Sequence, residues 1–370
     1  MKKLLLPTPR KILRFAKMFS DENDRRMAAA YAYEQLYAST KDFRCVPDIA
    51  LSVSKRKSSV KCLQCVDNNL VESDEVLFDN LQDEKIDSGC TTLLNALVES
   101  CWQHTIVVHV VSCGQKQNVH LSAYHALFQN LIEKIIFIIE PGAEVTIFDA
   151  PQQCEQHVIK YDMHIGERAQ VEMVFTDNNN CSQIVSSLNI FQSAFSTFVL
   201  HAVVGQSAYN FFNTRSHLSD LGVTTEVNMY PIAENGVMTH LVNEQLHNAS
   251  HTESKVKVHG AGLGSARIIC YSVGHVAALV KKVSVHHQTR ILALDETVKV
   301  FAYPYLAVAS SDVQCTHAAA VGMVSPEQFW YAASRGLDKL SIKYISLKGF
   351  LQGSLCEESI VSEIVRNRCK

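Results

Sequence analysis

Short apolar segments rich in β-branched residues recur through the middle of the chain and predict a mainly β fold. Each segment is three to seven residues long, and helical periodicity is largely missing between them. Residues 122–133 are the exception, where a helix is an alternative. The ten predicted strands are Ile106–Val111, Ile135–Ile139, Val145–Phe148, Val171–Phe175, Phe198–Val204, Thr224–Tyr230, Val256–Val258, Ile268–Val273, Val283–Val285 and Val298–Tyr303.

Turn-forming residues separate many of these segments. They lie at residues 140–142, 177–180, 234–236 and 260–264, and all four groups contain Gly or Asn. Many short strands joined by turns favour a sandwich, a barrel or a β-solenoid. The sequence has no strict hexapeptide or nonapeptide repeat, so periodicity alone does not separate these three architectures.

Helical patterns flank the strand-rich region on both sides. Residues 10–40 and 91–102 read as helices, with a polar, acidic stretch between them. We therefore expect three regions: 1-102 as an N-terminal helical region with a polar acidic linker, 103-322 as a β core, and 323-370 as a C-terminal helical domain.

The start of the first C-terminal helix is marked by capping residues. Ser325 is a good N-cap, Pro326 fits the first helical position, and Gln328 can complete a capping box. Gly336 can end this helix in a left-handed conformation. Two further helices are predicted, over residues 339–350 and 357–365.

Composition narrows the class of protein. A chain of 370 residues with 47% hydrophobic residues can bury a large core. The net charge of −3 argues against a nucleic-acid partner. No apolar run reaches the roughly 18 residues of a membrane span, and prolines at positions 7 and 9 interrupt the apolar start that a signal peptide would need. We expect a cytoplasmic protein whose 12 cysteines are free thiols.

Cys315 and His317 are the sharpest candidates for chemistry. They lie two residues apart at the end of the strand-rich region, so a strand would project both side chains from one face. A thiolate and an imidazole suit a soft transition metal. Two ligands cannot complete a tetrahedral site, so other ligands would have to come from elsewhere. The alternative is a core thiol beside a hydrogen-bonded histidine.

Other cysteines and histidines fit structural roles better. Cys62 and Cys65 form a CxxC pair, but the second pair that a zinc ribbon needs is missing from the sequence. Adjacent histidines at 286 and 287 would face opposite sides of a strand. Four histidines of the first strand region lack metal-ligand spacing, and we expect none of them to be a ligand: His104, His109, His120 and His125.

Two further motifs bear on function. The glycines at 260–264 lack the GxGxxG spacing, and the sequence contains no Walker A motif, so the chain is not expected to hydrolyse ATP. A second motif combines aromatic residues with arginine, a composition enriched at protein interfaces, although packing of a helical cap is an alternative. Its residues are Phe329, Trp330, Tyr331, Ser334, Arg335 and Gly336.

The C-terminal motifs resemble those of the SufB/SufD family of iron–sulfur cluster assembly proteins, and within it the SufD branch. The matching residues are Asp312, Val313, Cys315, His317, Val321, Gly322, Glu327, Gln328, Ser334, Arg335, Gly336, Gly349 and Phe350. The chain departs from the family pattern at Ser311, Ala318 and Ala320. Ala318 replaces a glycine, so the backbone freedom of that position is lost.

The resemblance implies a right-handed parallel β-helix flanked by N-terminal and C-terminal helical regions. It also implies a non-catalytic subunit that binds a SufB-like subunit through the β-helix and a SufC-like ABC ATPase through the C-terminal helices. His317, with Cys315 beside it, would face SufB and help hold transient iron or a nascent iron–sulfur cluster, with no cofactor held stably by this chain alone. Residues 292–299 lack the scaffold cysteine of SufB members, which favours the SufD branch.

Two rival functions remain open on sequence grounds. A polysaccharide lyase or hydrolase can be built on the same scaffold, and it would need clustered carboxylates or a basic residue on one solenoid face. A purely structural binding subunit would form the same complex, but Cys315 and His317 would then have no metal role.

Overall fold

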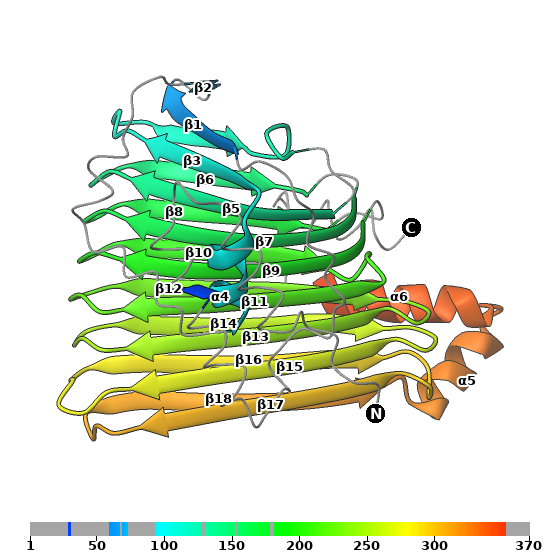
Figure 1. Ribbon diagram of the computed structural model, residues 1–370. Coiled ribbons are helices and arrows are strands. Elements are labelled where there is room, and N and C mark those ends of the chain that lie inside the picture. The colour runs from blue at the N-terminus through cyan, green and yellow to red at the C-terminus, as the bar shows by residue number, and fades with distance from the viewer. Residues whose placement is uncertain are drawn as a thin grey trace.

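The chain folds into a parallel β-solenoid made of two long sheets (Figure 1). The computed structural model describes residues 29–30, 59–66, 69–72, 93–126, 130–151, 154–177 and 181–352. Within these ranges one sheet has ten strands and the other has eight, and each turn of the solenoid adds one strand to each sheet. The prediction of a mainly β fold with a parallel solenoid core and C-terminal helices is confirmed.

From β3 onward the strands alternate between the two sheets along the chain. The ten-stranded sheet holds β1 (Ser59–Val66), β2 (Asn69–Glu72), β3 (His104–Val110), β5 (Asn130–Ile139), β7 (Cys154–Ile165), β9 (Cys181–Gln192), β11 (Tyr209–Leu218), β13 (Met238–His247), β15 (Arg267–Val276) and β17 (Lys299–Val308). The eight-stranded sheet holds β4 (Lys116–His120), β6 (Glu144–Asp149), β8 (Gln170–Thr176), β10 (Thr197–Val204), β12 (Thr224–Ala233), β14 (Glu253–Gly262), β16 (Val283–Ala293) and β18 (Val313–Met323). The described helices are α4 (Leu93–Cys101), α5 (Pro326–Ser334) and α6 (Lys339–Gln352).

One turn of the solenoid takes nearly thirty residues, and its length varies. Gln170 pairs with Thr197, Thr197 with Thr224, and Thr224 with Glu253, which are intervals of 27, 27 and 29 residues. The pairing is parallel throughout, except between β1 and β2. A repeat this long and uneven leaves no short periodic signal, which explains why the sequence alone did not separate a solenoid from a sandwich.

The core lies between the two sheets. Along β15 and β16 buried and less buried residues alternate, as expected for strands with one face on the core. A continuous cluster of buried apolar residues extends along the solenoid, from Leu63 on β1 to Ile291 on β16. Each fully buried aliphatic side chain stabilises the fold by roughly 1.5–3 kcal/mol, so this column is the main stabilising feature of the structure.

Most local predictions agree with the structure. All ten predicted segments coincide with strands, apart from one terminal residue each at Val111 and Val298, and the short helix predicted over residues 91–102 is α4. The alternative of a helix over residues 122–133 is wrong, because Tyr124 lies in a turn and β5 begins at Asn130. There the Tyr124 amide donates to Leu121 and the Leu121 amide to Phe148. Of the helix predicted over residues 10–40, only 29–30 are described, and they are helical; residues 357–365 lie outside the described ranges.

The glycine-rich segment at 260–264 is mostly strand, so the predicted turn lies later. Gly260 and Gly262 belong to β14, and a Cβ on Gly260 would lie 2.2 Å from the carbonyl oxygen of Pro231. Glycine is therefore required there for close approach of neighbouring turns. The chain turns at Gly264, where φ is +59°, a conformation that glycine adopts without strain.

α6 packs against the side of the solenoid near β14, and α5 packs against α6 (Figure 1). As predicted, Ser325 caps α5 in a capping box with Gln328, and Gly336 follows the helix with φ of +86°. α6 buries Leu347 and Leu351 in an apolar cluster with residues of β10, β12 and β14. None of the helices in the described ranges has the length and apolar character needed to cross a membrane.

Candidate functional site

The last turn of the solenoid presents an uncovered face. Among the described strands, β17 and β18 are the last of their sheets, so each has one edge that no other described strand pairs with. Their residues are mostly exposed or half-buried, whereas the preceding strands alternate between buried and exposed. Val308, Val321 and Met323 are 41%, 52% and 55% exposed. An apolar sheet end with free edges is a template for a further strand.

Cys315 and His317 lie on this uncovered face. On β16, Val283, Val285 and His287 are buried, and these are the residues that point into the solenoid. In the β16–β18 register Cys315 pairs with Val285 and His317 pairs with His287. Cys315 and His317 therefore belong to the inward-pointing row of the last turn. Within the part of the chain that the structure describes, no further turn covers this row, which leaves His317 exposed and Cys315 half-buried.

The two residues differ in their surroundings. Cys315 is half-buried against the small apolar cluster of Val283 and Val285, and burial raises the pKa of its thiol. His317 is exposed, while His287 behind it is 3% exposed. Burial, together with the neighbouring His317 and His286, lowers the pKa of His287 to about 4. The site thus combines an accessible imidazole with a protonated thiol.

Neighbouring polar contacts lie on the opposite face of β16. Nδ1 of His286 is 2.7 Å from the Thr316 hydroxyl, and its Nε2 is 2.9 Å from the Ser284 hydroxyl. His286 and His287 thus face opposite sides of the strand, in agreement with the sequence prediction. His286 is held by hydroxyl groups and points away from His317.

The aromatic residues of α5 are largely exposed. Trp330 and Tyr331 are 74% and 65% exposed, whereas Phe329 is half-buried, and α5 has no buried residue. The Tyr331 ring lies 5.3 Å from the Arg335 guanidinium. Packing of a helical cap does not account for Trp330 or Tyr331, and exposed aromatic residues beside an arginine are typical of protein-binding surfaces.

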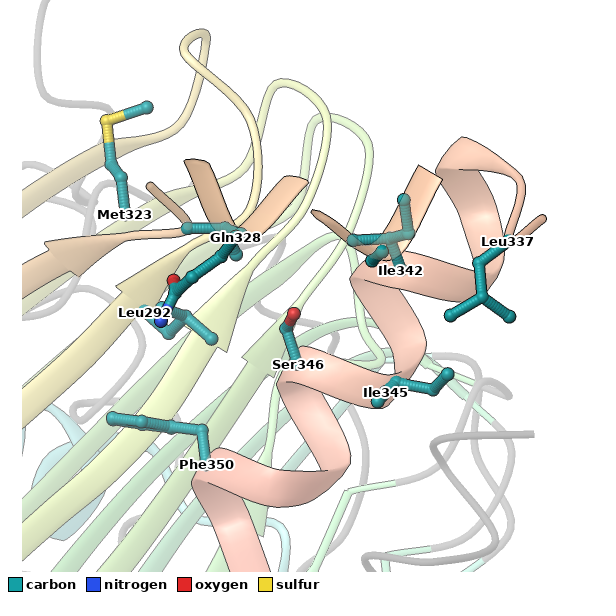
Figure 2. A pocket seen from close by; sticks show the side chains of 10 residues that line it. Leu292, Met323, Gln328, Leu337, Ile342, Ile345, Ser346 and Phe350 are labelled. Carbon is teal, nitrogen blue, oxygen red and sulfur yellow. The ribbon is translucent and has the colours of Figure 1, made fainter. Parts of the chain in front are cut away.

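A pocket of about 360 Å³ lies between the two C-terminal helices and the end of the eight-stranded sheet (Figure 2). Leu292 and Met323 come from the strands, Gln328 from α5, and Ile342 and Phe350 from α6. The lining is mainly apolar, and among its labelled side chains only Gln328 and Ser346 are polar. It offers packing surface without the charged groups of a catalytic pocket.

A second cluster, which the sequence analysis did not find, lies inside the solenoid. His125, Glu133 and His157 bring three ligand atoms within 4.8 Å of one another, and all three residues are buried. Glu133 Oε2 lies 2.5 Å from His125 Nδ1 and 3.1 Å from His157 Nε2. The prediction that His125 lacks ligand geometry considered linear spacing alone, and the fold brings distant residues together here.

Carboxylates and further polar groups surround this cluster. His104 Nδ1 lies 2.6 Å from Glu133 Oε1, and His125 Nε2 lies 2.7 Å from Asp149 Oδ1. Tyr161 donates to the other Asp149 oxygen over 2.6 Å. Burial opposes ionisation of His125, but the carboxylates of Asp149 and Glu133 on its two nitrogens raise its pKa well above the usual range.

The pKa values of Glu133 and His157 are both lowered, but for different reasons. Burial opposes ionisation of Glu133, yet the contacts with its three imidazoles hold its pKa well below the usual range. His157 has its pKa lowered, chiefly by burial. The cluster therefore contains an ionised carboxylate (Glu133) and a neutral imidazole (His157), both of which are suitable metal ligands, and a protonated His125 that would have to release a proton to bind a metal.

Two cysteines meet where strands of the same region begin. Cys154 and Cys181 are partners in the β7–β9 register, and their sulfur atoms lie 3.0 Å apart. The hydrogen bond between the two thiols raises the pKa of Cys154 and lowers that of Cys181. The CxxC pair is arranged differently: Cys65 is buried in the main core and Cys62 packs in a separate small cluster, so they do not form a joint site.

The chain matches a known protein family and several of its members. Residues 120–350, more than half of its length, match the family "SUF system FeS cluster assembly, SufBD core domain". The iron–sulfur cluster assembly protein SufD of Bacillus subtilis is 32% identical over 106 residues, 29% of this chain and 24% of that protein.

An iron–sulfur cluster assembly SufBD family protein of Methanothermobacter thermautotrophicus is 33% identical over 81 residues, 22% of this chain and 20% of the relative. One from Pyrococcus horikoshii is 29% identical over 82 residues, 22% of this chain and 18% of the relative. The matched segments thus span about a quarter or less of these relatives. The family match covers the solenoid from β5 to β18 together with α5 and most of α6, and with the two-sheet architecture it establishes that the chain belongs to the SufB/SufD family of the SUF iron–sulfur cluster assembly system.

Proposed function

We propose that this chain is a SufD-like, non-catalytic subunit that pairs with a SufB-like subunit through the last turn of its solenoid. The single observation that carries the proposal is the uncovered end formed by β17 and β18. Two free strand edges and an exposed apolar row would leave backbone groups and hydrophobic surface in water, which proteins normally avoid. A partner solenoid that adds its own strands would bury both.

His317 would then lie at the junction between the two subunits. It belongs to the inward-pointing row of the last turn and is exposed in the free chain. Ligands contributed by the partner would complete a site that Cys315 and His317 cannot complete alone. We propose that His317 helps accept iron during cluster building, while Cys315, with its raised pKa, has a weaker role.

The C-terminal helices are proposed to bind the ABC-type ATPase subunit. Trp330 and Tyr331 are exposed on α5, and Arg335 lies beside them. Trp330→Ala should leave the free energy of unfolding within about 0.5 kcal/mol of wild type, as for most exposed positions, yet weaken binding of the ATPase. We place this assembly in the cytoplasm, where the free thiols of the described cysteines would stay reduced.

The rival enzyme function lacks support from the carboxylates. Glu133 and Asp149 are buried inside the solenoid, where a polymeric sugar could not reach them. On the outer face of the eight-stranded sheet, Glu172 and Glu226 are accessible, but each forms an ion pair with a lysine. The rival structural function differs only in the role of His317. Comparison of the two variants below with the wild-type chain separates it from the proposal.

The test is co-expression of this chain with the SufB-like and SufC-like proteins of its own source. The complex is isolated by size exclusion, and iron and sulfide are measured after anaerobic reconstitution. His317→Ala should preserve the complex and lower cluster loading. The control is His275→Ala, an exposed histidine on β15, which should load normally. Equal loading in both variants would leave a purely structural subunit, and loss of the complex in both would contradict the proposed pairing.

A further inference from the structure

We propose that His125, Glu133 and His157 form a binding site for one divalent first-row transition metal ion inside the solenoid. The proposal concerns this chain alone and does not depend on any partner or on His317. Two imidazoles and one carboxylate are the protein ligands of many ferrous and zinc sites, which keep further positions open. The three ligand atoms lie within 4.8 Å of one another.

The present distances are close to those that a metal would require. Glu133 Oε2 lies 2.5 Å from His125 Nδ1 and 3.1 Å from His157 Nε2. Metal–ligand bonds of roughly 2.0–2.2 Å place neighbouring donors on the order of 3–3.5 Å apart. Metal binding would therefore replace two hydrogen bonds and move the donors apart by only about 1 Å or less.

The outer contacts are those expected around a metal ligand. His125 has its remaining nitrogen 2.7 Å from Asp149, and the second oxygen of Glu133 lies 2.6 Å from His104. Asp149 is itself fixed by a hydrogen bond from Tyr161. Metal-binding histidines commonly donate their other N–H to a carboxylate, which fixes the ring and raises its basicity.

Among the described residues, the carboxylates of this cluster have no lysine or arginine partner, unlike those of a nearby ion-pair network. Asp162 is buried and Glu99 nearly so, and they contact the ammonium groups of Lys160 and Lys134. Glu133 and Asp149 contact only imidazole and phenol groups among the described residues, and the His125 ring between them carries the one positive charge that they share. Two buried carboxylates around one imidazolium keep a net negative charge, which is costly in a protein core, and a divalent ion that displaces the His125 proton would neutralise it.

The buried His157 supports the same inference. It is 2% exposed, and its Nδ1 has no hydrogen-bond partner among the described residues. A closed hydrogen-bond network would normally satisfy both nitrogens of a buried imidazole. Among the described residues this ring packs edge to face on His125 and makes its hydrogen bond through Nε2 to Glu133, so Nε2 points at the proposed site.

Because the ligands are buried, metal would enter during folding or through local opening rather than by rapid exchange. The test therefore uses full-length chain produced in iron-supplemented medium and purified without oxygen. Bound iron is counted per chain by mass spectrometry. A second sample is stripped with a chelator, reloaded with Co²⁺ by prolonged incubation, and examined by visible and X-ray absorption spectroscopy.

We expect about one iron per wild-type chain and a Co²⁺ site with nitrogen and oxygen ligands only. Glu133→Gln and His157→Gln should each lower bound metal by about ten-fold or more. The matched control is His240→Gln, a buried histidine on β13 that packs against the rings of Phe211 and Tyr271. This control should bind as much metal as wild type.

Three results would overturn the proposal. They are a wild-type chain without metal under both conditions, equal metal in wild type and both ligand variants, and sulfur ligands around Co²⁺. The last result would assign the metal to Cys154 and Cys181 instead. If circular dichroism shows that a ligand variant does not fold, the wild-type Co²⁺ spectrum decides: nitrogen and oxygen ligands support the proposal, and an absence of bound Co²⁺ contradicts it.

Discussion

His317 lies directly beside His287 in the parallel register of β18 and β16, so an exposed imidazole covers a buried one. This relationship marks the end of the solenoid. His287 keeps the environment of a core residue because one more turn follows it, whereas no described turn follows His317. The same inward-pointing row that forms the core elsewhere therefore becomes a candidate interaction surface at the last turn.

The buried His287 should make stability depend on pH. Its pKa is about 4 in the folded chain, against about 6.5 when exposed. Between pH 6.5 and 4 the unfolded chain binds a proton at this residue and the folded chain does not, so lowering the pH favours unfolding. At 1.36 kcal/mol for each pKa unit, the contribution lost is on the order of 3 kcal/mol.

His287→Gln should flatten this dependence. The free energy of unfolding, measured by urea denaturation, should fall less between pH 6.5 and 4 in the variant than in wild type. The neighbouring histidines are present in both proteins, so the difference between the two curves reports on residue 287. Parallel curves would contradict the expected pKa.

An added methyl group should destabilise the fold at Gly260 and have almost no effect at Gly322. A Cβ on Gly260 would lie 2.2 Å from the Pro231 carbonyl oxygen, and this backbone atom can move only with its strand. Gly260→Ala should lower the free energy of unfolding by about 1–3 kcal/mol, as overpacking does in cores. Gly322→Ala should change it by less than about 0.5 kcal/mol, because a Cβ there meets nothing within 4 Å. Equal effects in thermal or urea denaturation would contradict the packing described here.

Lys160 should be essential to the attachment of α4 to the solenoid. Its ammonium group lies 2.5 Å from Glu99 on α4 and 2.7 Å from Asp162 on its own strand. Although burial opposes ionisation of Glu99, Lys134 and Lys160 lower its pKa to about 2. Lys160→Met would leave buried carboxylates underpaired and should cost about 3–5 kcal/mol.

The control for Lys160 is an exposed ion pair on the other sheet. Lys116 and Glu172 lie 3.2 Å apart and are 48% and 38% exposed. Lys116→Met should therefore cost no more than about 1 kcal/mol. Urea denaturation of both variants measures the difference. A Lys160→Met chain as stable as Lys116→Met would show that the buried network contributes little.

Cys154 and Cys181 should form a disulfide under mild oxidation. Their sulfur atoms lie 3.0 Å apart, and paired strands place Cα atoms about 4.8 Å apart, within the range that a disulfide accepts. Diamide would accept the two hydrogens, and peptide mass mapping would detect the crosslinked pair. Cys181→Ser should abolish it. Cys270, whose pKa burial raises to about 12, should stay reduced in the same experiment. Recovery of both thiols unmodified from folded wild type would contradict this prediction.

The sequence predicted the strands that carry β-branched residues, and it missed those that carry buried polar ones. β9, β11 and β13 contain Asn, Ser, Thr and Gln, yet most of their residues are buried. Their polar side chains bond to one another across neighbouring turns, as Thr214 does to Asn243. No local pattern distinguishes such strands from loops, because their partners lie a whole turn away.

The same reason explains which site residues were found. Cys315 and His317 are two positions apart on one strand, so strand geometry alone predicts a shared face. His104 and Glu133 are partners in the β3–β5 register although 29 residues separate them. Residues of the buried cluster such as His104 and Glu133 are separated by about one solenoid turn. This spacing can be recognised in the sequence only when the length of the turn is already known.

The most direct test of the central claim is amide hydrogen exchange of the free chain and of its complex with the SufB-like protein of its own source. The account predicts that amides of β17 and β18 exchange rapidly at their free edges and become protected in the complex. Strands in the middle of the solenoid, such as β9 and β11, should be protected in both states. A complex that forms without added protection in residues 299–308 and 313–323 would contradict the proposed pairing through the last turn.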